Sequence, residues 1–433
     1  MLVRLKSFFD PPHQPGHATR DFGQAPRRIF WTALAVRLLY MTLAHTYRIR
    51  LLDDHFEYGW EMGRIARALA TGYGYSDPFT GHTGPTAWTP PLYPLLLAGV
   101  FKLFGVYTLK SAWVVLAINS VFSAATAPVI YRIAWRCFER TGDGLKIALW
   151  SAWLWALYPA AMQYAVRWVW DMSLTAFLFA WVILLALRLR DNPSVLKPWL
   201  LFGVLWGLIA LSNSSLLAFL PFCAGWIVWH SLRRPAALRN LALSAAVCAA
   251  VVSPWVIRNA VAFHAFVPMR TNFGAELYQA AQPASEGYPW VASLPRAEAS
   301  PEFQRYKRLG ELEYSRRQGE RAMALIRTHR RIFITHILKR IYFFWNSVPH
   351  PTDQGLTVEV TREANFAFLS LSGILGLALA LRNRIPGAWL FFWAFAIYPL
   401  TYYAITVQAR FRHPLEPLIC ILGVYLFRSA EPR

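Results

Sequence analysis

The chain alternates long apolar runs with short polar segments, most of which are basic. Ten of the runs approach the length that a helix needs to cross the hydrocarbon core of a membrane, roughly 20 residues. They cover residues 29–43, 112–131, 148–162, 172–187, 199–211, 216–229, 241–257, 366–381, 388–403 and 415–426. The pattern predicts an all-α polytopic membrane protein, a bundle of about ten transmembrane helices.

Lys and Arg predict the orientation of this bundle, because they are enriched in cytoplasmic loops. When the N-terminal tail is placed in the cytoplasm and the helices alternate, the inner loops are YRIAWRCFERTGDGLK, RLRDNPSVLK, HSLRRPAALRN and RNR, all of them basic. The C-terminal FRSAEPR also falls inside, so both termini are predicted to be cytoplasmic. This assignment requires PPLYPLLLAGVFKLFG, residues 90–105, to lie along the outer face without crossing.

Four regions follow from this topology. They are a basic tail (1–28), an N-terminal transmembrane module (29–257), a large outer segment (258–365) and C-terminal transmembrane helices (366–433). The tail lacks an apolar core of signal-peptide length and is expected to stay on the protein. The N-terminal module contains a first outer segment, 47–110. The 258–365 segment ends in one or two amphipathic helices, expected to carry Phe343, Phe344 and Trp345 towards the membrane interface.

Composition agrees with a membrane protein and excludes other classes. Hydrophobic residues make up 56% of the chain and charged residues 15%, and the mean hydropathy is +0.31, more apolar than a soluble fold requires. The net charge of +21 comes from clusters between apolar runs, so it indicates topology signals and not a nucleic-acid surface. The four cysteines are scattered singly, which predicts buried thiols and neither a disulfide framework nor a CxxC metal site.

One acidic stretch stands out in this basic chain. It is LLDDHFEYGWEMGRIARAL, residues 51–69, directly after the first apolar run. On a helix, Asp54, Glu57 and Glu61 fall at positions i, i+3 and i+7 and share one face. Carboxylates gathered in this way can act as a general base. The simpler interpretation is that Glu57 or Glu61 is solvated or pairs with Arg64 one turn away.

The predicted topology places the other unusual polar residues on the same outer side. They are Asp171 and Arg167 in QYAVRWVWDMSL, Asn213 in LSNSS, Arg258 in SPWVIRN, and Arg410 and Arg412 in QARFRHPLEP. Structural explanations exist for some of them, since Asp171 can pair with Arg167 at i−4 and interfacial arginines often snorkel. Carboxylates and arginines gathered at one membrane face nevertheless predict a site that acts on a lipid-linked phosphate.

The order of the motifs carries a resemblance to a known family. An acidic first outer loop is followed by IARALATGYGYSDPF, GPTAWTPPLYPLLLAGVFKLFG, RWVWDMSL, SPWVIRNAVAFHAFVPMRTNFGAELY and QARFRHPLEPLICILG. In this order the chain resembles the polyprenyl-phosphate-sugar-dependent glycosyltransferases of the GT-C superfamily, specifically the protein mannosyltransferase and aminoarabinose transferase branch. The resemblance implies a GT-C-like bundle and transfer of a sugar from a polyprenyl phosphate to an acceptor. Inversion at the anomeric carbon would follow from a single displacement.

The resemblance also implies roles for individual residues. Glu61, Glu57 or Asp54 would be the base, and Asp171 would orient the acceptor. Arg258, Arg410 and Arg412 would bind the donor phosphate, and Arg167 and Asn213 would contribute to the same substrate site. The chain departs from the family at two places. The usual position of the acid is Tyr58 here. The aminoarabinose branch also has a second acid just before its Pro-Pro, where this chain has Trp88 and Thr89, so a metal-binding acid pair is not supported.

Two other classes of function remain open on the sequence. In a transporter or lipid flippase the same charged residues would line a substrate path, and in a cell-envelope scaffold they would have no chemical task. No Walker A motif and no GxGxxG after a strand is present, so no nucleotide is expected. The glycosyltransferase interpretation implies a polyprenyl-phosphate sugar as donor, an acceptor that is a lipid, glycan or protein, a bacterial inner membrane, and a divalent cation in some family members.

Overall fold

The computed structural model describes residues 19–232, 234–289, 294–295, 298–349 and 355–430. Most of the predicted cytoplasmic tail therefore lies outside the described residues. Within these ranges the ordered elements are helices, and the one β pairing is an isolated antiparallel bridge between Ser76 and Pro85. The predicted all-α fold is confirmed.

Five of the ten apolar runs lie in helices that are long and apolar enough to cross a membrane. These helices span Leu109–Phe138, Met172–Asp191, Ser214–Ser231, Pro235–Phe263 and Leu356–Arg382. Three shorter apolar helices cover Leu92–Phe104, Gly144–Leu157 and Leu196–Ala210. That the remaining runs also cross, and that residues 90–105 do not, stay predictions.

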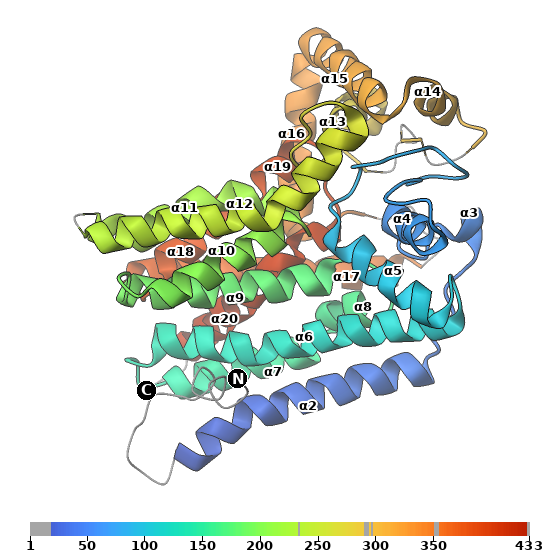
Figure 1. The fold of residues 1–433 in the computed structure, drawn as a ribbon. Helices are drawn as coiled ribbons and strands as arrows, with labels where there is room; N and C mark the ends of the chain where they lie inside the picture. Colours follow the sequence, from blue (N-terminus) through green and yellow to red (C-terminus); the bar gives the residue numbers. More distant parts are fainter. Residues whose placement is uncertain (1–18, 233, 290–293, 296–297, 350–354, 431–433) are drawn as a thin grey trace.

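The long helices run side by side and form the body of the molecule (Figure 1). They are α2 (Thr19–Leu43), α6 (Leu109–Phe138), α7 (Gly144–Leu157), α9 (Met172–Asp191), α10 (Leu196–Ala210), α11 (Leu220–Val228), α12 (Pro235–Phe263), α17 (Leu356–Arg382), α18 (Ala388–Ile397) and α20 (Glu416–Ala430). Helix α6 packs against α2, α7 and α9, α10 packs against α12, and α17 packs against α20. The start of α2 and the end of α20 lie at one end of this bundle.

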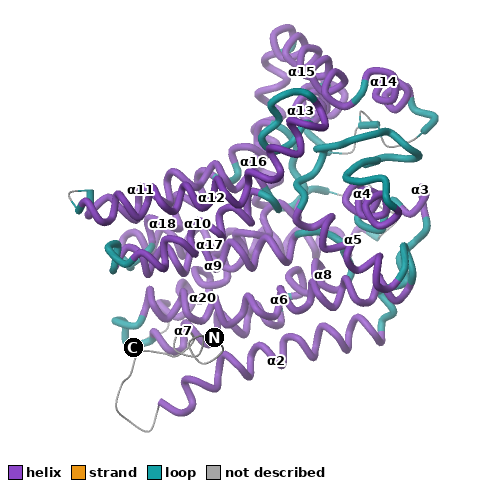
Figure 2. The backbone as a smooth tube through the Cα atoms, viewed as in Figure 1, coloured by secondary structure: helices purple, strands orange, loops and turns teal. Residues whose placement is uncertain are grey.

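The 47–110 and 258–365 segments gather at the opposite end, which we call the loop-rich end; Figure 2 shows the longest loops there. Its helices are α3 (Leu52–His55), α4 (Trp60–Thr71), α5 (Leu92–Phe104), α13 (Phe273–Ala281), α14 (Pro301–Leu309), α15 (Glu311–Thr328) and α16 (Arg330–Asn346). Three connections between bundle helices also lie at the loop-rich end. They contain α8 (Pro159–Val166), η1 (Ser214–Phe219), and α19 (Leu400–Ala404) with η4 (Ala409–Leu415).

A buried arginine ties three helices of the bundle together. Arg37 on α2 is fully buried, and its guanidinium donates to the hydroxyl of Ser123 on α6 at 3.1 Å and to the carbonyl of Ala156 on α7 at 2.7 Å. A charged group inside a membrane protein is costly unless its donors are satisfied. The hydrogen bonds therefore fix the packing of α2 against α6 and α7.

The acidic stretch is not the single helix that the sequence predicts. Helix α3 ends at His55 and α4 begins at Trp60, so Asp54, Glu57 and Glu61 do not share one helical face. Between the two helices the chain passes through left-handed conformations, with φ of 89° at Gly59 and 51° at Trp60. A left-handed residue ends regular helix geometry, which separates Glu61 from the other two acids.

The predicted position of the aromatic residues near the end of α16 is also wrong in part. The rings of Phe343 and Phe344 are 5% and 1% exposed. Phe344 lies parallel to the ring of Tyr402, with the centroids 6.2 Å apart. These rings attach α16 to the bundle and do not reach towards a membrane interface.

Close approach of α17 and α20 depends on Gly376. A β-carbon at this position would lie 2.1 Å from the carbonyl oxygen of Leu422 on α20. We expect Gly376→Ala to force the two helices apart and to lower the free energy of unfolding by about 1–3 kcal/mol. Gly225 in α11 is the matched control, because a β-carbon there meets nothing within 4 Å. Thermal unfolding in detergent measures both variants, and equal melting temperatures would contradict this packing.

Candidate functional site

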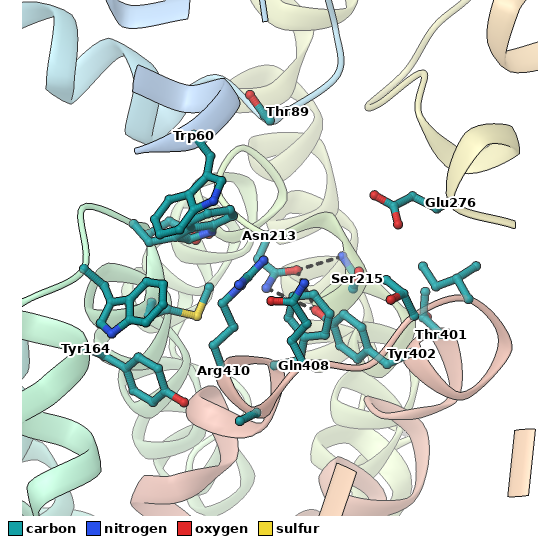
Figure 3. A pocket seen from close by; sticks show the side chains of 18 of the residues that line it. Trp60, Thr89, Tyr164, Asn213, Ser215, Glu276, Thr401, Tyr402, Gln408 and Arg410 are labelled. Carbon is teal, nitrogen blue, oxygen red and sulfur yellow. Dashed lines mark hydrogen bonds between the residues drawn. The ribbon is translucent and has the colours of Figure 1, made fainter. Parts of the chain in front are cut away.

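A cavity of about 830 Å³ lies at the loop-rich end of the bundle. Its wall is assembled from the start of α4, the α8–α9 connection, the turn before η1, the start of α13, the start of α17 and the α19–η4 connection. Figure 3 shows polar side chains from these elements facing one another across it. The cavity therefore collects residues from positions 60 to 411 of the chain.

Glu61 is the acid of the first outer segment that lines this cavity. It is 7% exposed and occupies the first turn of α4, where the helix dipole favours a negative charge. Arg64 on the same helix interacts with Glu61 electrostatically, but among the described residues no ion pair within 4.0 Å joins the two side chains. Glu61 is thus a carboxylate on the cavity wall that does not serve an ion pair.

Asp171 is a second cavity acid and precedes the first residue of α9. It is 3% exposed, and its Oδ2 accepts a hydrogen bond from the hydroxyl of Thr175 at 3.2 Å. Its Oδ1 is buried and has no hydrogen-bond partner in the described part of the chain. Burial raises the pKa of Asp171 to about 6, against the opposing effects of Thr175, Arg410 and Arg270.

The pairing of Asp171 with Arg167 that the sequence allowed is not formed. Arg167 is exposed at the end of α8 and is not among the residues that line the cavity. No ion pair joins it to Asp171 in the described ranges. The structural explanation for Asp171 therefore fails, while the proposed substrate role of Arg167 finds no support from its position.

Two arginines of the cavity act on the charge of Asp171. Arg410 lines the cavity and lies over the ring of Trp170, 4.1 Å from the centroid. Arg270 also lines it, and its Nε donates to the carbonyl of Trp88 at 3.1 Å. The sequence predicted Arg410. Arg270 lies within the motif SPWVIRNAVAFHAFVPMRTNFGAELY but was not singled out, because it stands in a part of the motif without periodicity.

Asn213 completes the polar set that the sequence foresaw in the cavity. It precedes η1 and accepts a hydrogen bond from the main-chain amide of Ser215 at 3.2 Å (Figure 3). Its side chain also lies 3.4 Å from the hydroxyl of Tyr402. The amide is held in place by both contacts and presents a fixed donor and acceptor to the cavity.

Four other predicted residues lie outside the cavity lining. Asp54 is exposed and forms an ion pair with Arg67 at 3.0 Å. Partial burial would raise the pKa of Asp54, but the interaction with Arg67 outweighs this effect and lowers the pKa. Glu57 lies in the turn between α3 and α4. Arg412 is fully buried and bonds the carbonyl of Phe366 and the carboxylate of Glu416, at 2.9 and 3.1 Å.

The fourth of these, Arg258, belongs to a motif with a different task. In SPWVIRN, Arg258 donates to the carbonyls of Thr86, at 2.6 Å, and Tyr75. Two further side chains of the motif donate hydrogen bonds to the segment that follows it. The Trp255 indole donates to the carbonyl of Met269 at 2.9 Å, and the Asn259 side-chain amide donates to the carbonyl of Val267 at 3.1 Å. The motif thus fastens both outer segments to the end of α12.

A buried carboxylate that the sequence did not single out joins the same two segments. Glu311, the first residue of α15, is 5% exposed. It accepts hydrogen bonds from the hydroxyls of Thr86, Thr271 and Tyr306 at 2.5, 2.5 and 2.8 Å and from the amide of Ala87 at 2.6 Å. Burial raises the pKa of Glu311, although these four hydrogen bonds oppose the shift.

We name the contacts of Arg258, Arg270 and Glu311 the segment clamp. They fix Thr86–Trp88 against residues 270–271, and the next residues along each stretch, Thr89 and Asn272, line the cavity. The clamp therefore sets the distance between two parts of the cavity wall that are about 180 residues apart in the chain.

The cavity residues do not define a metal centre. In the described ranges no group of three or more His, Cys, Asp or Glu side chains is placed to hold a metal ion. The third cavity acid, Glu276, accepts a hydrogen bond from the side-chain amide of Asn272 at 3.3 Å.

One part of the chain matches a described protein family. Residues 89–257 match the family described as dolichyl-phosphate-mannose-protein mannosyltransferase. This match confirms the resemblance to GT-C glycosyltransferases that the motifs predicted. The protein is an integral membrane protein whose matched family carries glycosyltransferase activity. No curated protein sequence matches the chain.

Several solved structures are similar to the chain. The oligosaccharyltransferase of Archaeoglobus fulgidus, in a complex with Zn and sulfate, shares 16% identity over 92% of this chain and 49% of its own, with a TM-score of 0.49. A structure of the same enzyme with an inhibitory peptide and a dolichol-phosphate shares 15% sequence identity. That match covers 92% of this chain and 50% of the enzyme, with a TM-score of 0.48. ArnT from Cupriavidus metallidurans, bound to undecaprenyl phosphate, shares 14% sequence identity. That match covers 91% of this chain and 77% of ArnT, with a TM-score of 0.40. The chain spans about half the length of the archaeal enzyme.

The segment clamp predicts a large effect of a small change at Glu311. Glu311→Gln replaces one acceptor oxygen by an NH₂ group that faces donors, and we expect it to lower the free energy of unfolding by about 1–3 kcal/mol. Limited proteolysis should become faster within the 258–365 segment. Glu313→Gln is the control, because Glu313 pairs with exposed arginines on the outer face of α15. The clamp would be refuted if both variants melted and were cleaved alike.

Asp171 predicts a pH-dependent difference in stability. The unfolded carboxyl titrates near 3.9 and the folded one near 6, so the folded protein binds this proton more tightly. Its contribution to the free energy of unfolding therefore falls as the pH rises from about 4 to 6, by about 3 kcal/mol at most. Asp171→Asn removes this loss.

The melting temperature of Asp171→Asn relative to wild type should therefore rise between pH 4 and pH 7. Asp191→Asn, at the exposed far end of the same helix, should show no such gain. A difference that stays constant across this range would mean that Asp171 is not held protonated by burial.

Proposed function

We propose that this protein is an integral membrane glycosyltransferase that transfers a sugar from a polyprenyl-phosphate donor to an acceptor at the periplasmic face of the membrane. The observation that carries the proposal is one cavity lined by the carboxylates Glu61 and Asp171 and the guanidinium groups of Arg270 and Arg410. The matched family, described by its dolichyl-phosphate-mannose donor, supports a lipid phosphate as the carrier.

Arg410 and Arg270 are the proposed phosphate ligands. Arginine forms strong charge-assisted hydrogen bonds with phosphate oxygens. Both guanidinium groups act on the charge of Asp171, so they lie within electrostatic reach of one point in the cavity. There they would stabilise the negative charge that develops on the phosphate as it leaves the sugar. Arg258 and Arg412, which the resemblance had suggested, have terminal guanidinium nitrogens engaged in main-chain and carboxylate contacts.

Glu61 is the proposed general base. The acceptor hydroxyl oxygen forms a bond to the anomeric carbon, and its proton passes to the Glu61 carboxylate. The bond between the anomeric carbon and the phosphate oxygen breaks, and its electron pair remains on the polyprenyl phosphate. A single displacement of this kind inverts the anomeric centre. Asp171 would orient the acceptor through Oδ1, the oxygen that has no partner within the described residues.

The arrangement of the ends supports the proposed orientation in a bacterial inner membrane. Helix α2 starts and α20 ends away from the cavity (Figure 1), and basic residues such as Arg136 and Arg428 pair with acids at that end. With this end in the cytoplasm, the cavity opens at the periplasmic side. We propose the same regional boundaries as before, at residues 28, 257 and 365.

A transfer assay tests the proposal and the base together. Purified protein would be given radiolabelled undecaprenyl phosphate sugars and a cell-envelope acceptor extract. We expect Glu61→Gln to lower the transfer rate by about 10²–10⁴-fold, the usual contribution of a general base. Glu57→Gln and Asp54→Asn are matched controls, because these acids lie outside the cavity lining, and they should transfer at the wild-type rate.

Other outcomes have definite meanings. Transfer that survives in Glu61→Gln but collapses in Asp171→Asn would move the role of base to Asp171. Transport of a substrate along a gradient by wild type, without sugar transfer from any donor, would replace the proposal with the transporter interpretation.

A further inference from the structure

Three tryptophans form one side of the cavity. Trp60, Trp168 and Trp170 all line it, and the indoles of Trp60 and Trp168 are parallel to within 7°, with centroids 5.2 Å apart. The centroid of Trp170 lies 4.5 Å from that of Trp60. We call these three rings the tryptophan wall. Each of them is only half-buried, and Figure 3 shows the indole of Trp60 beside the cavity.

The main chain holds the wall in an unusual conformation. Trp60 has a φ of 51°, a left-handed conformation that is a genuine outlier for a bulky residue. The preceding Gly59 packs so closely that a β-carbon there would lie 3.2 Å from Val169, between the other two tryptophans. The carbonyl of Trp168 accepts a hydrogen bond from Asn119 on α6 at 3.2 Å. Strain that the surroundings hold in place at a cavity indicates a functional constraint.

The wall also connects the groups that the proposed reaction needs. Trp60 directly precedes Glu61, and Trp170 directly precedes Asp171. Arg410 lies over Trp170 at 4.1 Å. In the proposed reaction the glycosyl group lies between the phosphate, which Arg410 binds, and the acceptor oxygen, which Glu61 deprotonates. A ring in that position has the tryptophan wall along its side.

We propose that the tryptophan wall is the sugar subsite and that the donor carries a pyranosyl group whose C–H face packs on these indoles. The face of an aromatic ring is negative, so it attracts the weakly positive C–H groups of a pyranose. This inference rests on the proposed function. It also separates the two halves of donor recognition, because the arginines bind the phosphate and the wall binds the sugar.

Binding of two related lipids tests the subsite. Undecaprenyl phosphate and undecaprenyl phosphate hexoses (glucose, mannose and galactose) would be titrated into protein in nanodiscs, with native mass spectrometry as the readout. In wild type we expect at least one hexose lipid to bind about ten-fold more tightly than undecaprenyl phosphate. Trp168→Leu should remove that advantage and leave the affinity for undecaprenyl phosphate unchanged.

Two variants separate a subsite from a loss of structure. Trp168→Phe keeps an aromatic face and should retain most of the preference for the hexose lipid. Trp229→Leu removes an exposed tryptophan at the other end of the bundle and should bind both lipids as wild type does. Equal weakening of both lipids in Trp168→Leu, or an unchanged preference, would overturn the subsite while the proposed function stands. Failure of wild type to bind either lipid would overturn the proposed function and the subsite with it.

Discussion

The site depends on the requirement that buried main-chain polar groups find hydrogen-bond partners. Two long irregular segments cover the loop-rich end, and neither of them forms a sheet within the described ranges. Their carbonyls and amides therefore need donors and acceptors from side chains. Arg258, Arg270 and Glu311 provide these at Thr86–Trp88. Together with the main-chain hydrogen bond from Thr271 to Ala87, the clamp fixes two parts of the cavity wall relative to each other.

Much of the architecture could be predicted from the sequence, because helix length and apolar patterning are local properties. The topology argument also gathered the right residues at one end: Glu61, Asp171, Asn213 and Arg410 all line one cavity. Asp171 and Asn213 share a recognisable signal, since each is a polar residue beside the end of an apolar run, whereas Glu61 and Arg410 lie in polar stretches between such runs. Such residues have few positions available to them apart from the end of the bundle.

The remaining site residues could not be predicted, because their roles depend on contacts between distant segments. Arg258 sits in a motif that suggests a ligand, yet its partners are two carbonyls more than 170 residues away. Glu311 has no local signal in GELEY. The break between α3 and α4 was missed for another reason, since the acidic stretch has helical spacing and only the left-handed backbone at Gly59 and Trp60 interrupts it. Tertiary packing overrides local preference at both places.

The family match covers residues 89–257, so it ends at the motif that begins the second segment. The hydrogen bonds by which Arg258, Arg270, Trp255 and Asn259 reach the two outer segments end on main-chain carbonyls. A hydrogen bond to a main-chain carbonyl does not depend on which side chain the accepting residue carries. The side chain of Met269, whose carbonyl accepts from Trp255, can therefore change while the fastening is kept. Because Met269 also lines the cavity, a change there can alter which acceptors fit without loosening the assembly.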